Sequence, residues 1–149
     1  MALSTIEKVL FLKSVRLFDQ IPSEQLVTVA QIAQEVEFET QETIIRQGEE
    51  GDCLYIVVEG EAEVMVGGGI ISHIEAKSVI GEMAILSGEP RSASCVATTH
   101  LLALKINRHD FWALMEERSE ISLGIIKILV HNLSLANQML QNQPTTSDH

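Results

Sequence analysis

The chain has 149 residues, of which 46% are hydrophobic, and a formal net charge of -11. This length suits one domain with an ordinary hydrophobic core, and the apolar share is too high for a disordered chain. A nucleic-acid-binding surface needs a basic stripe, and no run of Lys or Arg is present, so the sequence argues against nucleic acid as a partner.

The cysteines, the signal-sequence pattern and the length of the apolar stretches indicate a cellular compartment. Cys53 and Cys95 each lie in an apolar run and are expected to be buried free thiols, because two cysteines so placed give neither a disulfide framework nor a metal site. We find no secretory signal and expect no stretch long and apolar enough to cross a bilayer. We therefore expect a cytoplasmic protein without direct membrane insertion.

The N-terminal region is expected to be helical over residues 4–34. Ser4-Thr5-Ile6-Glu7 has the pattern of a capping box. Residues 17–22 end this first helix, and Ser23 is expected to cap a second one. The inner face of the second helix would consist of Leu26, Val29, Ala30 and Ala33.

From residue 36 to residue 106 the pattern changes to that of short strands. Residues 36–39 alternate between apolar and charged side chains, and residues 53–58 have the composition of a buried strand. Several short strands at close spacing indicate a β barrel or sandwich. The expected fold class is therefore α+β, mainly β, with flanking helices in a single domain over residues 1–142.

The segment around residues 80–94 has the chemistry of a nucleotide site. Gly81 permits unusual backbone angles, the next four residues favour one helical turn, and residues 88–90 break it. The start of a helix presents free N–H groups to an anion. Arg91 is a fork suited to phosphate, and Glu82 can accept hydrogen bonds from sugar hydroxyls.

The run Gly81-Glu82-Met83-Ala84-Ile85, followed by Pro90-Arg91-Ser92-Ala93-Ser94, resembles the phosphate-binding cassette of the cyclic nucleotide-binding domain family. That family includes the regulatory subunit of the cyclic-AMP-dependent kinase and the bacterial catabolite activator protein. Glycines 48, 51 and 60 also match, and the resemblance covers roughly residues 17–135. It implies an eight-stranded β-roll, or jelly roll, with N-terminal helices and two C-terminal helices.

Two positions depart from the family pattern. Lys77 stands where the family often has Gly, and Ile80 where it often has Phe. These changes affect a turn and a core contact, and leave the ligand site intact.

The resemblance also implies a role for each cassette residue. Arg91 would pair with the cyclic phosphate, the backbone amides of Met83 and Ala84 would donate to it, and Glu82 would accept from the ribose 2′-hydroxyl. Ser92 would contact phosphate or guanine, which leaves cyclic AMP and cyclic GMP both open. The candidate ligand-binding residues are Gly81, Glu82, Met83, Ala84, Arg91, Ser92 and Ala93.

Two helices are expected over residues 108–141, before a polar, disordered tail at 143–149. Asn107 would cap the first helix, and Ser119 would cap the second. Trp112 on the first helix could lie in the core or be half-exposed, and we expect the core. The second helix carries two apolar stripes. They consist of Ile121, Ile125, Ile128, Leu135 and Met139, with Asn132 in the same spacing, and of Ile126, Leu129, Leu133, Ala136 and Leu140.

Two interpretations of these stripes stay open. One broad face could lie in a single core. Alternatively, one stripe packs on the roll and the other contacts a partner, which could be another copy in a homodimer, because the spacing resembles a coiled-coil seam in which a lone Asn could fix the pairing. In the family the C-terminal helices move over the bound phosphate, and either Leu129 or Leu133 would cap the base.

The expected function is a regulatory sensor for cyclic AMP or cyclic GMP, with no cofactor or metal and with an effector domain as a further partner. The alternative is a domain of the same fold that acts as an interaction or dimerisation module without nucleotide. An enzyme is not expected, because the five histidines are in no metal or triad spacing. DNA binding is not expected either, because the chain is acidic and shows no helix-turn-helix after its last helix.

Overall fold

The structure, a computed structural model, describes residues 2–142 apart from the side chains of Ala84 and Ile85. The expected disorder of residues 143–149 therefore lies outside the described residues. The helices are α1 (Thr5–Lys13), the 3-10 helix η1 (Arg16–Phe18), α2 (Ser23–Ile32), α3 (Glu82–Ser87), α4 (Arg108–Glu117) and α5 (Ser119–Gln141). The strands are β1 (Gln34–Phe38), β2 (Thr43–Ile45), β3 (Cys53–Glu59), β4 (Ala62–Val66), β5 (Gly69–Ile74), β6 (Val79–Ile80), β7 (Ser94–Ala97) and β8 (Leu101–Asn107).

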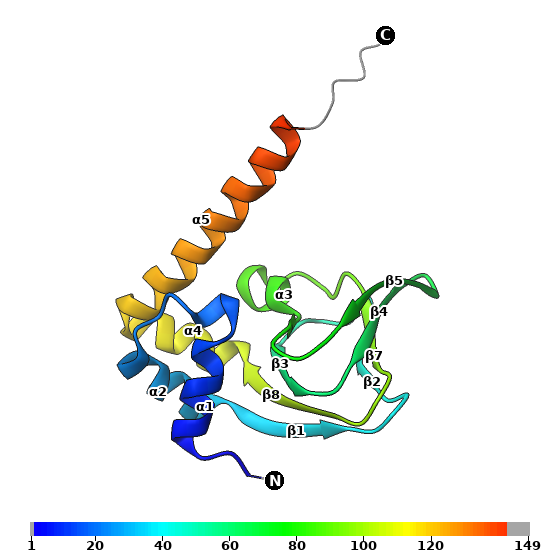
Figure 1. Cartoon of the computed structure of the whole chain (residues 1–149), viewed down its shortest axis with the longest axis horizontal. Coiled ribbons are helices and arrows are strands. Elements are labelled where there is room, and N and C mark those ends of the chain that lie inside the picture. Colours follow the sequence, from blue (N-terminus) through cyan, green and yellow to red (C-terminus); the bar gives the residue numbers. More distant parts are fainter. Residues whose placement is uncertain (1, 143–149) are drawn as a thin grey trace.

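The strands form two four-stranded sheets that face each other. One sheet has the order β1-β8-β3-β6 and the other β2-β7-β4-β5, and the paired strands are antiparallel. In Figure 1 the N-terminal helices, α4 and the start of α5 gather at one end of this roll. The predicted mainly β, α+β fold is confirmed.

Strands β3 and β8 are buried on both faces, because they separate two hydrophobic cores. Leu54 and Ile56 of β3 point into a core that they share with the helices. The alternating Tyr55 and Val57 point into the roll, together with Leu101 of β8. A strand that is buried on both faces has a continuous run of apolar residues in its sequence. This explains why the composition of residues 53–58 predicted a buried strand.

The N-terminal helices differ from the sequence prediction in two places. The first helix ends at Lys13 rather than at residues 17–22, and the separate 3-10 helix η1 follows it. The second difference is the cap of α2. The Ser4–Glu7 capping box is present, and the predicted inner face of α2 is buried. Ser23, however, is the first helical residue, and Pro22 occupies the cap position. The N–H groups of Gln25 and Leu26 both donate to the Pro22 carbonyl, so the helical hydrogen bonds begin one residue earlier than predicted.

The C-terminal helices bring two further corrections. Arg118, not Ser119, occupies the cap position of α5, because its carbonyl accepts from Ile121 and Ser122. Trp112 is 39% exposed rather than in the core. Its neighbour Phe111 takes the inward position on α4 and meets Phe18 edge to face, at 6.1 Å between ring centroids.

Helix α5 begins in the core and then leaves the domain, as Figure 1 shows. Ile121, Gly124, Ile125 and Ile128 are buried, whereas the residues from Leu129 to the end are exposed. The first apolar stripe is therefore buried only as far as Ile128, and both stripes are uncovered beyond it.

Helix α5 also corrects the expectation about membrane spans. It is the one helix of the described residues that is long and apolar enough to cross a bilayer by length and composition. The first turns of the same helix, with Ile121 and Ile125, are buried in the core of the domain. We therefore describe α5 as a helix of the folded domain.

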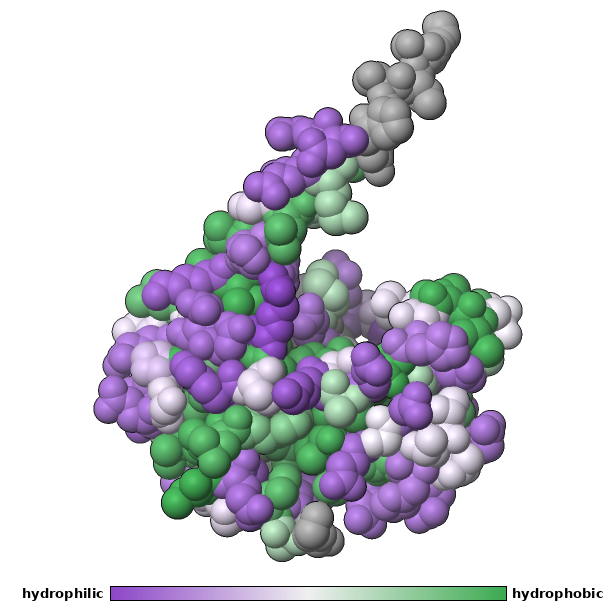
Figure 2. Space-filling model, in the orientation of Figure 1, coloured by the Kyte–Doolittle hydropathy of each residue, from purple (hydrophilic) through white to green (hydrophobic). Residues whose placement is uncertain are grey.

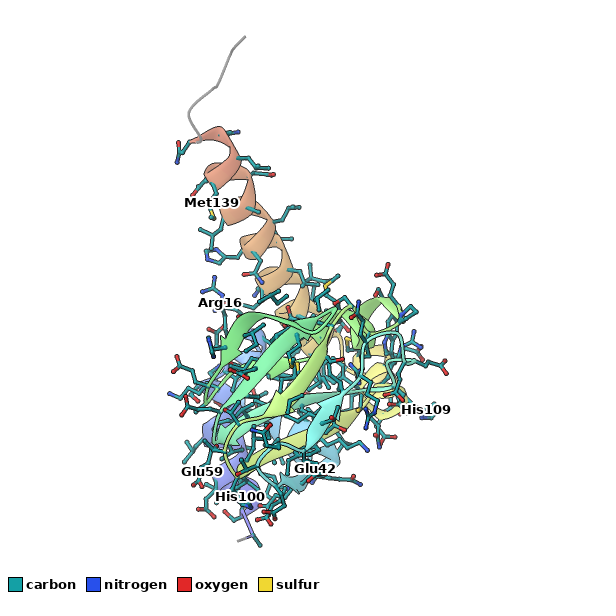
Figure 3. All side chains as sticks on the ribbon, turned by 90° about the vertical axis from the view of Figure 1, so that its right-hand side faces the viewer. Arg16, Glu42, Glu59, His100, His109 and Met139 are labelled. Atoms are coloured by element: carbon teal, nitrogen blue, oxygen red, sulfur yellow. The ribbon has the colours of Figure 1, made fainter. Side chains whose placement is uncertain are left out.

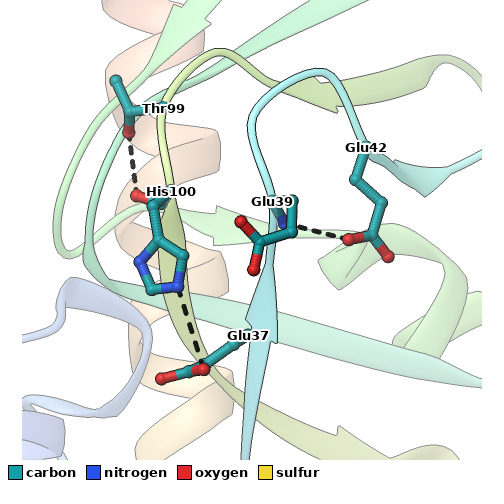
Figure 4. A network of polar contacts seen from close by, with 5 residues as sticks. All are labelled: Glu37, Glu39, Glu42, Thr99 and His100. Atoms are coloured by element: carbon teal, nitrogen blue, oxygen red, sulfur yellow. Dashed lines mark hydrogen bonds and ion pairs between the residues drawn. The ribbon is translucent and has the colours of Figure 1, made fainter.

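A small polar network holds together the turns between β1 and β2 and between β7 and β8 (Figure 4). His100 Nε2 lies 3.8 Å from a carboxylate oxygen of Glu37, and the Thr99 hydroxyl donates to the His100 carbonyl at 2.9 Å. In the neighbouring turn the Glu39 N–H donates to the Glu42 carboxylate at 2.9 Å. These exposed contacts involve none of the predicted ligand-binding residues.

Candidate functional site

The predicted cassette folds as a tight turn, a short helix and a second turn. Gly81 follows β6 with a φ of 85°, α3 begins at the next residue, and Gly88 follows its end with a φ of 75°. A left-handed φ favours glycine. At Gly81 space matters as well, because an added Cβ would overlap the Nη1 atom of Arg91.

Arg91 is the buried centre of this arrangement, with only 6% of its surface exposed. Its Nη2 donates to the carbonyl of Cys53 at 2.7 Å. Its backbone N–H donates to the Glu49 carbonyl at 2.8 Å, and its own carbonyl accepts from Gly48 at 2.9 Å. The turn before β3 therefore fixes the backbone of Arg91, and the first residue of β3 fixes its side chain.

The Nη1 atom of Arg91 is buried and has no hydrogen-bond partner among the described residues. An orphaned donor on a buried, charged group is costly. This donor is therefore suited to an acceptor supplied by a bound anion.

Glu82 opens α3 in a half-buried position. Burial raises the pKa of its carboxyl group above the ordinary value, because the charged form is poorly solvated there. A hydroxyl group that donates to this carboxylate would favour the charged form.

A cavity of about 740 Å³ lies over the cassette, between the roll and α5. Six of the seven predicted residues line it, namely Gly81, Glu82, Met83, Arg91, Ser92 and Ala93. Ala84, the seventh, lies in the same turn of α3, and its side chain is outside the described part of the structure.

Helix α5 lines the cavity with residues other than those predicted. Ile128 and Asn132 face the cavity, whereas Leu129 and Leu133, the predicted base-capping residues, do not line it. Each true lining residue precedes a predicted one by one position, which is a rotation of about 100° around a helix. Periodicity alone could not fix that rotation.

Three further residues line the cavity but were not predicted as ligand-binding residues, namely Arg16, Lys77 and Cys95. Cys95 lines the cavity, and burial raises the pKa of its thiol to about 11, which keeps it neutral. Arg16 and Lys77 add positive charge from η1 and from the turn before β6. Lys77 has a φ of 74°, so the position where the family often has glycine keeps a glycine-like backbone here.

The end of the cassette packs against α4 through Arg108. An added Cβ at Gly88 would lie 2.8 Å from Arg108 Nη2. The guanidinium of Arg108 stacks on Trp112, 5.8 Å from the ring centroid, which is a cation–π distance. The side chain of Arg108 on α4 therefore lies against the backbone of the cassette at Gly88.

The chain belongs to the cyclic nucleotide-binding domain family, whose model matches residues 35–118. It is 28% identical over 144 residues to a cAMP-dependent protein kinase regulatory subunit of Dictyostelium discoideum, covering 91% of this chain and 42% of the relative. It is 40% identical over 89 residues to a cGMP-dependent protein kinase of Plasmodium berghei, covering 58% and 10%.

A solved structure with the same fold is the regulatory domain of Toxoplasma gondii PKA with cAMP. It is 29% identical with a TM-score of 0.71, and the match covers 87% of this chain and 49% of that one. The chain thus spans less than half the length of each of these relatives.

Proposed function

We propose that this chain is a sensor that binds a cyclic nucleotide in the cavity over its cassette. The observation that carries the proposal is the buried, positioned guanidinium of Arg91, whose Nη1 lacks an acceptor among the described residues. A cyclic phosphate supplies that acceptor and its negative charge.

The remaining contacts follow from where the lining residues lie. The backbone amides of Met83 and Ala84, in the first turn of α3, would donate to the same phosphate. The half-buried carboxylate of Glu82 would accept from the ribose 2′-hydroxyl. Ser92 and Ala93, after Arg91, complete the wall beside the phosphate.

Asn132 favours cyclic AMP over cyclic GMP as the ligand. The side-chain amide of Asn132 lines the cavity from α5, beside the apolar Ile128. An amide can donate to a ring nitrogen of adenine while accepting from its amino group. On the corresponding edge guanine presents two acceptors, so only the donor half of the amide would be used.

The output of the sensor would be a shift in the position of α5. Ile128 and Asn132 would touch the base, while Gly124 of the same helix approaches residues 20 and 21 closely. A ligand that contacts α5 in one arrangement better than in another shifts the population towards it. An effector domain joined to this chain would respond to that shift.

The exposed part of α5 favours a second role, as a dimerisation helix. Figure 2 shows hydrophobic residues along the projecting part of α5 and at the tip of β4 and β5. Leu129, Leu133, Leu135, Met139 and Leu140 are all exposed there. We propose a cytoplasmic homodimer through this helix. A module that dimerises but binds no nucleotide is the alternative function.

A thermal-shift experiment separates the two functions. Cyclic AMP, cyclic GMP, 2′-deoxy cyclic AMP and linear 5′-AMP are added to purified protein. The sensor function predicts that the cyclic ribonucleotides raise the unfolding temperature most. The 2′-deoxy compound stabilises less, because Glu82 loses its hydroxyl partner. No shift with any compound, for protein that is folded and free of carried-over ligand, supports the module without nucleotide.

A further inference from the structure

A second hollow, of about 390 Å³, lies where η1 meets α5. Figure 3 shows Arg16 beside the lower part of α5, far from Met139 near the other end of the helix. The hollow is lined by Arg16, Asp19, Gln20, Lys127, Ile128 and His131. Arg16 and Ile128 also line the nucleotide cavity, so the two hollows share a wall.

The second hollow is basic in an acidic chain. The whole protein has 21 Asp and Glu against 10 Lys and Arg, yet Arg16, Lys127 and His131 meet here with a single carboxylate, Asp19. Lys127 and His131 are four residues apart and share one face of α5. Within residues 2–142, none of the ion pairs includes any of these three bases.

Asp19 offsets only part of this charge, because one carboxylate faces both Arg16 and Lys127. Its carboxylate accepts from Gln20 Nε2 at 3.3 Å and forms no ion pair within the described range. The guanidinium of Arg16 and the ammonium of Lys127 line the same hollow without an ion pair within the described range, and like charges in one hollow disfavour each other. A bound anion would relieve that repulsion.

We propose that this hollow binds a phosphate group. The fork of Arg16, the ammonium of Lys127 and the imidazole of His131 supply more donors than the two oxygens of a carboxylate need, and the tetrahedral oxygens of a phosphate can engage all three. Free phosphate compounds and phosphorylated side chains present the same group. The inference goes beyond nucleotide sensing and does not depend on it.

Such a phosphate would act on α5. Arg16 belongs to η1 while Lys127 and His131 belong to α5, so a phosphate between them would hold the helix against η1. Because Arg16 and Ile128 face both hollows, occupancy of one changes the affinity of the other, and this coupling is reciprocal.

The test is a titration of the whole chain with inorganic pyrophosphate, and separately with phosphoserine amide, in about 150 mM salt to screen weak contacts. The imidazole proton signals of His131, assigned with His131→Gln, report occupancy. We expect a dissociation constant below about 1 mM for at least one of them, and the tighter one identifies the source. Arg16→Gln and Lys127→Gln should each weaken binding about tenfold. Arg46→Gln removes an exposed charge that lines neither hollow, and should not.

Two variants separate this site from the nucleotide cavity. The proposal expects that Arg91→Ala keeps pyrophosphate binding, whereas Lys127→Gln binds pyrophosphate about tenfold more weakly and still binds cyclic nucleotide. Loss in Arg91→Ala with retention in Lys127→Gln would place the phosphate in the nucleotide cavity and overturn the proposal. No binding of either probe by the natural chain would overturn it as well. If the natural chain bound no cyclic nucleotide, the pyrophosphate titrations of Arg91→Ala and Lys127→Gln would still test this proposal.

Discussion

At the residue scale, the site depends on how closely Arg91 passes under Gly81. Two features restrict position 81, namely its φ of 85° and the space taken by Arg91 Nη1. Gly68, at the hairpin tip, has nearly the same φ, 84°, but open space around its Cα. The two glycines therefore separate backbone strain from steric conflict.

Gly81→Ala should displace Arg91 and lower affinity for cyclic nucleotide at least about tenfold, the scale of a lost charge-assisted hydrogen bond. Gly68→Ala should leave affinity unchanged, while both variants lose about 1 kcal/mol of stability to left-handed strain. Ligand titration and urea unfolding measure the two effects. Equal affinities for the two variants would contradict the steric role of Gly81.

Glu82 predicts a pH dependence of stability. Burial raises the pKa of this acid in the folded state, so its stabilising contribution is complete below the unfolded-state pKa and is lost as pH rises through the folded-state pKa. Glu82→Gln removes this loss. Without ligand, the stability of the variant relative to the natural chain should increase from pH 4 to pH 7. A constant or falling difference in urea unfolding would show that Glu82 is not destabilised by burial.

At the element scale, α5 has a docked half and a projecting half. Gly124 permits the docked half to lie against residues 20 and 21, since an added Cβ would be 2.6 Å from Ile21 Cγ1 and 3.1 Å from the Gln20 carbonyl oxygen. Ile21 is fully buried and has little room to move. The position of the helix therefore depends on this glycine.

Gly124→Val should lower the free energy of unfolding by about 1–3 kcal/mol, the usual cost of overpacking a core. Ala136→Val makes the same kind of addition at an exposed position of the same helix and should cost less than about 0.5 kcal/mol. Urea unfolding compares the two. A Gly124→Val protein as stable as Ala136→Val would mean that α5 does not dock through this contact.

The projecting half of α5 predicts self-association. Leu133 is 63% exposed on an apolar face, and Leu133→Asp would place a charge in the interface of a dimer. Sedimentation equilibrium should find a dimer for the natural chain and a monomer for Leu133→Asp. As a control, Leu10→Asp, on the exposed side of α1, should stay dimeric. If the natural chain were monomeric at a protein concentration of tens of micromolar, the proposed dimer would be wrong.

At the scale of the whole molecule, the local part of the site was predictable and the long-range part was not. Gly81, Glu82 and Arg91 belong to one continuous motif, so the sequence alone brought them together. Asn132 and Arg16 reach the cavity only through packing of distant elements. Strand β6 has only two residues, Val79 and Ile80, which is too short for a periodic pattern.

Some features cannot be read from residue types at all. The Cys53 carbonyl orients Arg91 through the backbone, and the identity of the side chain carries no sign of that role. The exposure of Trp112 depends on the rotation of α4, which Phe111 sets by occupying the core. The net charge of -11 likewise hides the local positive charge of the cavity.

The most direct test of the central claim is calorimetric titration of ligand-free protein with cyclic AMP and cyclic GMP, beside Arg91→Ala. We predict micromolar or tighter binding that prefers cyclic AMP. Arg91→Ala should lose about 2 kcal/mol or more of binding free energy, because it removes the buried partner of the phosphate. His100→Ala, in the distant turn network, should bind as the natural chain does. Folded protein that binds neither nucleotide, or an Arg91→Ala affinity within a few-fold of the natural chain, would contradict the account.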